Sequence, residues 1–221
     1  MASRRKVGNL LALAVLSAVV QRPMHPYEVA SVLRSRGKGE DMEIKWGSLY
    51  TVVGNLAKHG FVEAVESERA GARPERTIYR ITDAGRAELV DWASELVSTP
   101  QPEWPRFKAG LSVLAALEPD EALEMLRRRL HALDAGIADL RAALDRHRRE
   151  VPRLFLVEDE YEIAVREAEA EWVRSLVGEL SSGSFPGLEE WRRWHAAGGA
   201  PTGGAGQAGA PSPADRGEAD R

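Results

Sequence analysis

The residues best suited to chemistry are small polar and basic side chains of the kind that contact nucleic acid. One set falls within residues 46–59 and consists of Ser48, Thr51, Asn55 and Lys58. An asparagine amide can pair with the edge of adenine, and hydroxyl groups reach either bases or phosphates. A second set surrounds Gly71 and Pro74 and consists of Arg69, Arg73 and Arg76. Arginines so placed are expected to neutralise phosphate charge.

Three further basic residues, Arg4, Arg5 and Lys6, precede an apolar run over residues 7–20. They could serve as a phosphate-contacting N-terminal arm. The run imitates a signal peptide, but no small-residue cleavage site follows it. It is also too short to span a bilayer. We therefore expect a buried first helix in a cytoplasmic protein that has no membrane partner.

The polar set requires a helix to present it. Leu49, Val53 and Leu56 recur at helical spacing within residues 46–59, so they predict an inward stripe opposite the polar face. Two helices are expected before this one, over about residues 7–20 and 27–36. Pro26 suits the first turn of the second of them, where its missing N–H is no loss.

The basic set requires a hairpin. Residues 61–66 and 76–81 resemble strands, with a loop over 67–75 between them. A fourth helix is expected over about residues 83–97, capped by Thr82. Three helices followed by a hairpin is the order of a winged helix-turn-helix, in which the third helix enters the major groove. The predicted fold class is mainly α, with this small β-hairpin wing and a helical, coiled-coil-like dimerisation domain after it.

The second half of the chain begins beyond a proline-rich boundary at residues 98–105. Aliphatic residues then recur at alternating spacings of three and four, as in a coiled-coil seam; they are Leu123, Leu126, Leu130, Leu133, Ile137, Leu140 and Leu144. A last long helix is expected over about residues 154–180, with one apolar stripe; its members are Tyr161, Val165, Ala168, Trp172, Leu176 and Leu180. The predicted domains are 1–98, 105–182 and a disordered tail over 196–221.

The seam has two interpretations. It could pack within one chain on the last helix, or it could form a dimer interface, and we expect both. A protein that reads palindromic DNA needs a two-fold partner. The predicted homodimer contacts are the seam residues together with Trp172 and Leu176.

Several classes of chemistry find no support in the sequence. The chain has no cysteine and only five scattered histidines, so we expect no metal site. It contains no phosphate loop, nucleophile–base arrangement or dinucleotide fingerprint, so we expect neither an enzyme nor a cofactor. Trp92, Trp104 and Trp172 could line an aromatic ligand pocket, although such tryptophans are more often core residues.

The charge is divided unevenly. Residues 1–98 hold 14 Lys and Arg against 12 Asp and Glu, a net charge of +2, whereas residues 99–221 hold 16 against 22, a net charge of −6. A DNA-facing front half with an acidic rear half fits this pattern. The overall acidity also leaves open an alternative, a protein-interaction module that has the fold without DNA binding.

Four motifs occur in an order that is specific. They are Pro23-Met24-His25-Pro26-Tyr27-Glu28-Val29, Trp46-Gly47-Ser48-Leu49-Tyr50, Gly60-Phe61-Val62, and the run Arg76-Thr77-Ile78-Tyr79-Arg80-Ile81-Thr82-Asp83-Ala84-Gly85. Over about 80 residues the chain resembles the PadR family of transcriptional regulators. Residues 169–174 also look like the last helix of the longer PadR subclass. Pro26 stands where the family usually has glycine, and the tail after Trp194 has no counterpart.

The resemblance implies a homodimer that binds an inverted repeat in double-stranded DNA as a repressor. It also implies release by a small aromatic or hydrophobic effector. The DNA contacts of the family map onto Ser48, Tyr50 and the basic hairpin. From the residues alone the role of Tyr50 stays open, since tyrosine has both an apolar ring and a hydroxyl and could pack under the wing rather than contact phosphate.

Overall fold

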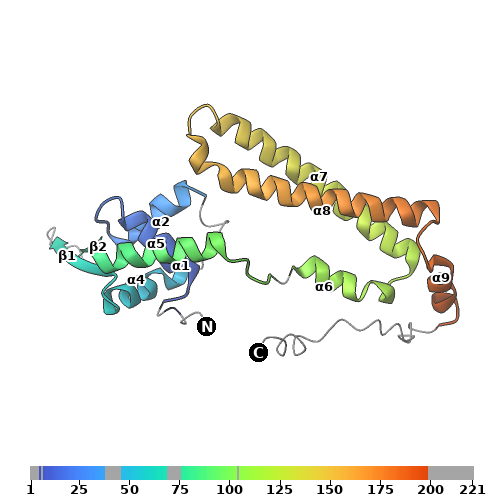
Figure 1. The fold of residues 1–221 in the computed structure, drawn as a ribbon, viewed down its shortest axis with the longest axis horizontal. Helices are drawn as coiled ribbons and strands as arrows, with labels where there is room; N and C mark the ends of the chain where they lie inside the picture. The colour runs from blue at the N-terminus through green and yellow to red at the C-terminus, as the bar shows by residue number, and fades with distance from the viewer. Residues whose placement is uncertain (1–4, 6, 38–45, 69–75, 104, 199–221) are drawn as a thin grey trace, which may run out of the picture. The chain divides into compact units, whose positions relative to one another are not determined.

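The computed structural model describes two separate units within the chain. The described residues are 5, 7–37, 46–68, 76–103 and 105–198. The chain divides between Glu103 and Trp104, and the buried cores of the two units share no residue. The fold class is as the sequence predicts: a helical protein with one antiparallel hairpin (Figure 1).

The first unit begins with α1 (Leu10–Val19), which is the centre of its core. Asn9 caps the helix, because its side chain accepts a hydrogen bond from the backbone N–H of Leu11 at 2.8 Å. Nearly every residue of α1 is buried, as an all-round apolar sequence predicts. The helices and the wing of this unit therefore pack around α1.

α2 (Pro26–Ser35) follows, with Pro26 at its first position. His25 is the N-cap, and its Nδ1 accepts a hydrogen bond from the backbone N–H of Tyr27 at 3.1 Å. The third helical element consists of a 3-10 turn, η1 (Trp46–Ser48), that continues into α4 (Leu49–Lys58). α4 buries one stripe against α1 and α2; its members are Leu49, Val52, Val53 and Leu56.

The wing is a two-stranded antiparallel sheet of β1 (Val62–Glu68) and β2 (Arg76–Ile81), with a bulge between Ala64 and Glu66. Met24 forms one further antiparallel bridge with Tyr79 of β2. The backbone N–H of Met24 donates to the carbonyl of Tyr79, and the N–H of Tyr79 donates to the carbonyl of Met24, both at 3.0 Å. The wing is thereby joined to the segment that leads into α2.

α5 (Asp83–Ser98) ends the regular part of the first unit and packs on α1. Thr82 caps it: the hydroxyl Oγ1 accepts from the backbone N–H of Gly85 at 3.0 Å and donates to the carbonyl of Gly60 at 2.6 Å. One threonine therefore fixes the start of α5 to the turn that follows α4.

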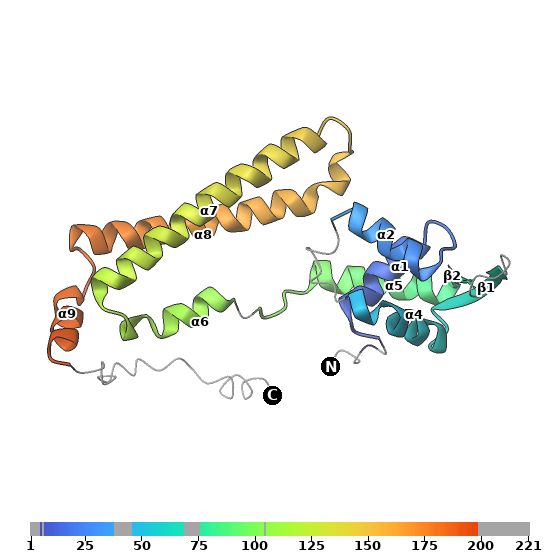
Figure 2. The ribbon, with the colours of Figure 1, turned by 180° about the vertical axis from the view of Figure 1, so that it is seen from behind.

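The second unit is built on a long helical hairpin of α7 (Pro119–His147) and α8 (Val157–Ser182), which lie side by side in Figures 1 and 2. Before the hairpin come α6 (Arg106–Ser112) and the 3-10 turn η2 (Leu114–Ala116). A further turn, η3 (Arg153–Phe155), precedes α8. The predicted last helix of 154–180 therefore begins three residues later and ends two residues later.

A short helix that the sequence analysis did not anticipate, α9 (Leu188–Ala196), follows the hairpin. Leu188 and Trp191 are buried in the same core as residues of α7 and α8. The indole Nε1 of Trp191 donates to the carbonyl of Leu117 at 3.0 Å, and Nε2 of His195 lies 3.0 Å from the carbonyl of Ala115. The helical unit thus extends beyond residue 182. Most of the predicted disordered tail, residues 199–221, lies outside the described residues.

Candidate nucleic-acid interface

The outward face of α4 carries the polar residues expected to contact DNA. Thr51, Asn55 and Lys58 are exposed on the side of the helix away from its buried stripe. Ser48 is half-buried in η1, just before the helix begins. The structure therefore brings the four onto one continuous surface of η1 and α4, and small polar side chains on such a surface permit a close approach to base edges.

Tyr50 projects from the same surface. Its side chain is 63% exposed, and its ring meets that of His25 edge-on, with the ring centroids 6.4 Å apart. The ring lies against the N-cap residue of α2 rather than under the wing, and contact of Tyr50 with phosphate remains a prediction. The phenol is thus free of the core, in a position from which it can donate a hydrogen bond outward.

Gly54 lies in the middle of this face. A Cβ atom at this position would meet no other atom within 4 Å. A glycine inside a helix lowers helix stability by about 1 kcal/mol relative to alanine. Packing within the first unit does not require glycine at position 54. A molecule that approaches α4 closely from outside would require it.

The basic tip of the wing falls largely outside the described residues. This applies to Arg69 and Arg73, whereas Arg76 is the first residue of β2. Arg80, further along β2, is bound to Glu63 of β1 through its Nη2 at 2.6 Å. The wing assignments therefore remain predictions.

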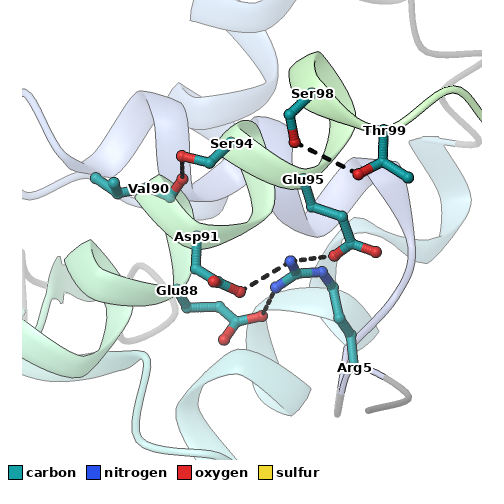
Figure 3. A network of polar contacts seen from close by, with 8 residues as sticks. All are labelled: Arg5, Glu88, Val90, Asp91, Ser94, Glu95, Ser98 and Thr99. Atoms are coloured by element: carbon teal, nitrogen blue, oxygen red, sulfur yellow. Dashed lines mark hydrogen bonds and ion pairs between the residues drawn. The ribbon is translucent and has the colours of Figure 1, made fainter. Parts of the chain in front are cut away.

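Arg5 is not available as part of a phosphate-contacting arm, which corrects that expectation. Its guanidinium donates to carboxylates of α5: to Glu88 at 2.8 Å, to Asp91 at 2.9 Å and to Glu95 (Figure 3). Arg4 and Lys6 lie outside the described residues.

The same guanidinium lies over Trp92, 5.3 Å from the ring centroid. Burial acts to lower the pKa of Arg5, but the hydrogen bonds to Glu88, Glu95 and Asp91 outweigh it and raise that pKa. Arg5 is therefore a permanently charged tie between the N-terminal segment and α5. The sequence does contain a signal for it, because the three carboxylates and Trp92 recur at helical spacing on one face of α5.

The tryptophans expected to line a ligand pocket are distributed over both units of the chain. Trp92 is 4% exposed and belongs to the core of the first unit. Trp104 lies outside the described residues. Trp172 belongs to α8 and is half-exposed, with its ring edge-on to Phe107 at 6.1 Å between centroids. The pocket remains a prediction.

The seam of α7 packs within the chain. Leu126, Ile137 and Leu144 are buried, and the half-buried members are Leu123, Leu130, Leu133 and Leu140. On α8, Leu176 is buried in the shared core of the hairpin. The seam therefore packs within the chain, and its contact with a second copy remains a prediction.

The predicted single stripe on α8 is in fact two. The residues buried against α7 are Ile163, Ala170, Val173, Leu176 and Leu180. Apolar residues on another side are exposed by about half or more; they are Val157, Tyr161, Val165 and Trp172. We refer to these four as the outer stripe of α8.

Among the described residues, no three histidine or acidic side chains are grouped so as to hold a metal ion. None of the helices described is both long and apolar enough to cross a bilayer.

These features define a class: a winged helix with a small polar recognition surface, followed by a helical hairpin. Residues 15–91 match the family described as "Transcriptional regulator PadR-like family". The match confirms, over that part of the chain, the resemblance found in the motifs, and the family is one of transcriptional regulators. The chain is 22% identical over 138 residues to the negative transcriptional regulator PadR of Bacillus subtilis, which covers 62% of this chain and 75% of that protein.

Solved structures show the same fold. Bacillus subtilis PadR in complex with operator DNA gives a TM-score of 0.65 at 19% identity and covers 77% of this chain and 99% of its own. The same protein in complex with p-coumaric acid gives 0.65 at 19% identity, covering 78% and 99%. The Vibrio cholerae virulence activator AphA gives 0.58 at 17% identity, covering 78% and 98%.

Proposed function

We propose that this protein is a repressor that binds an inverted repeat in double-stranded DNA as a homodimer. The observation that carries the proposal is the exposed, small, polar face of α4 in a PadR-like winged helix. That face enters the major groove, where Asn55 and Thr51 contact base edges. Ser48, Tyr50 and Lys58 contact the backbone around them, and the wing contributes Arg69, Arg73 and Arg76.

Repression is favoured by the Bacillus subtilis relative, which is a negative regulator. A related structure with p-coumaric acid supports a small aromatic effector. We propose that such a ligand releases the protein from its operator. Because the two units have separate cores, an effector held by the helical hairpin would act by changing the spacing of two recognition helices.

The homodimer is supported by the outer stripe of α8. Four apolar side chains stay exposed on one side of a helix whose other apolar side is already covered by α7. An exposed apolar stripe of this kind is typical of a surface that binds a partner. A second copy of the chain is the partner that a palindromic site requires.

The DNA-binding proposal is tested by titrating the full chain against a duplex from its own promoter at several salt concentrations. Phosphate contacts release counterions, so the logarithm of the association constant should fall linearly with the logarithm of salt concentration. A slope near zero would remove the proposal and favour a protein-interaction module instead. Adding p-coumaric acid to the bound complex tests the effector class, and release of the duplex is the expected result.

The dimer is tested by light scattering on the variant that carries both Tyr161→Glu and Val165→Glu. Two charges on the outer stripe should give the mass of a single chain and weaken operator binding. The matched control carries Ala135→Glu and Ala142→Glu, since both alanines are exposed on the side of α7 away from its buried seam. A dimer that survives the double change would place the interface elsewhere.

A further inference from the structure

Arg34 and Trp46 form a stacked pair next to the start of the recognition element. Arg34 belongs to the last turn of α2, and Trp46 is the first residue of η1, which continues into α4. The guanidinium carbon of Arg34 lies 4.4 Å from the centroid of the Trp46 ring. Trp46 is half-buried and packs on the core of the first unit, whereas Arg34 is exposed. The indole is thus a fixed platform for an arginine on the surface.

The other arginines of this unit whose side chains the structure describes either donate to a side-chain acceptor or lack an aromatic ring to rest on. Those that donate to a side-chain acceptor are Arg5, Arg22, Arg36 and Arg80. Arg86 is exposed, and among the described residues its side chain has neither an acceptor nor an aromatic platform. Of the arginine side chains described in this unit, Arg34 alone is held on an aromatic ring while its hydrogen-bond donors have no acceptor among the described residues.

An arginine stacked in this way is suited to binding phosphate. Stacking uses the face of the guanidinium and leaves the N–H groups in its plane directed outward. These groups match two phosphate oxygens at once, which a lysine ammonium does not do. The location fits as well, because the N-terminal end of a recognition helix is the end that approaches the bases, and the DNA backbone flanks it.

We infer that Arg34, held on Trp46, binds a backbone phosphate and fixes the register of α4 on the duplex. The inference rests on the proposed DNA-binding function and adds a positioning contact to it. A purely structural role would be different: a cation near the C-terminal end of α2 stabilises the helix dipole without touching DNA. The two roles predict different dependence of binding on salt.

The experiment measures the salt dependence of operator binding by the full chain with Arg34→Gln. Each lost phosphate contact should lower the magnitude of the log–log slope by about 0.9 per protomer on the duplex. At a salt concentration of about 0.1 M, the same relation gives a roughly eightfold loss of affinity per protomer relative to about 1 M. Arg34→Lys keeps the charge, so it should keep most of the slope while losing affinity.

Two further variants separate the effect of holding the Arg34 side chain in place from the effect of the protein's net charge. Trp46→Leu removes the platform but not the cation, so affinity should fall while the slope stays near that of the wild type. Arg86→Gln removes an equal charge from the same unit and should leave the slope unchanged. Thermal melting of each variant gives its folded fraction, by which its affinity is corrected.

The outcomes are distinct. A wild-type slope in Arg34→Gln, with or without a loss of stability, overturns the contact and leaves only the helix-stabilising role; DNA binding by the wild type would still stand. An equal drop in Arg86→Gln also overturns it, because the slope would then follow net charge. If the wild type shows no salt-dependent binding to the duplex, both the proposed function and the Arg34–phosphate contact are overturned.

Discussion

Gly85 lies against the carbonyl oxygen of Phe61, so close that a Cβ atom at position 85 would be 2.0 Å from that oxygen. The same carbonyl accepts a hydrogen bond from the backbone N–H of Thr82 at 3.1 Å. The first turn of α5 therefore packs directly on the backbone at Phe61, which lies between α4 and β1 of the wing. No side chain can move aside to relieve the collision, since the opposing atom belongs to the main chain.

Gly85→Ala should therefore destabilise the first unit by about 3 kcal/mol, the upper range for overpacking a well-filled site. Urea unfolding followed by circular dichroism measures the change. Gly54→Ala is the matched control, because a Cβ there meets nothing. If Gly85→Ala lowers the free energy of unfolding by less than about 1 kcal/mol, α5 can move away from Phe61 at little cost.

Gly54→Ala should itself separate stability from function. Alanine raises helix stability by about 1 kcal/mol. Yet the added methyl group lies on the face of α4 proposed to approach the bases, so operator affinity should fall. Gly178→Ala in α8 serves as the control, since its Cβ is equally unobstructed and only stability should change. Unchanged affinity in Gly54→Ala would show that this part of α4 stands away from the duplex.

The tie between Arg5 and α5 should be measurable by a double-mutant cycle. The Arg5 side chain is 12% exposed and that of Glu88 22%, so their ion pair is better shielded from water than most on the surface. Arg5→Gln should cost about 2 kcal/mol, since it leaves three carboxylates without their cation. The coupling to Glu88→Gln should be about 1 kcal/mol.

The exposed pair of Arg22 and Glu28 provides the comparison for this cycle. Pairs open to solvent contribute little to stability. Equal coupling in the two cycles would contradict a special role for the Arg5 network. A loss of stability that appears without coupling to Glu88 would assign the effect to packing on Trp92 instead.

α9 offers a test within one short helix. Trp191 is 5% exposed and hydrogen-bonded to Leu117, whereas Trp194 is 38% exposed. Trp191→Ala should destabilise the second unit by about 3–5 kcal/mol, as expected for a large buried aromatic. Trp194→Ala should change stability by less than about 0.5 kcal/mol. Differential scanning calorimetry compares them, and equal effects would mean that α9 does not belong to the core.

The winged helix was predictable because its signals are local. Leu49, Val53 and Leu56 repeat at the spacing of one helical face, and all three are buried. Thr82 caps α5 as its position before the helix suggests. The polar face of α4 follows from the same periodicity, since whatever lies opposite the buried stripe must be outside.

Contacts between distant segments were not predictable in the same way. Arg5 and Glu88 are separated by more than 80 positions. The spacing of the α5 carboxylates groups them on one face, but it does not indicate which cation binds them. Arg34 stacks on Trp46 only because α2 and η1 meet in space. On α8, periodicity grouped Tyr161 with Leu180, but partner helices decide which apolar side is covered. α9 was not predictable, because a segment of nine residues, four of them charged, gives a weak helical signal on its own.

The separate cores of the two units also bear on how this protein can change over time. A substitution in the packing around α1 needs compensation only from residues before 104, and one in the hairpin only from residues after it. Under the proposed function, selection can therefore alter the effector that the hairpin binds without disturbing the operator that α4 contacts. After duplication of such a gene, one copy of the protein could acquire a new effector while it still binds the same operator.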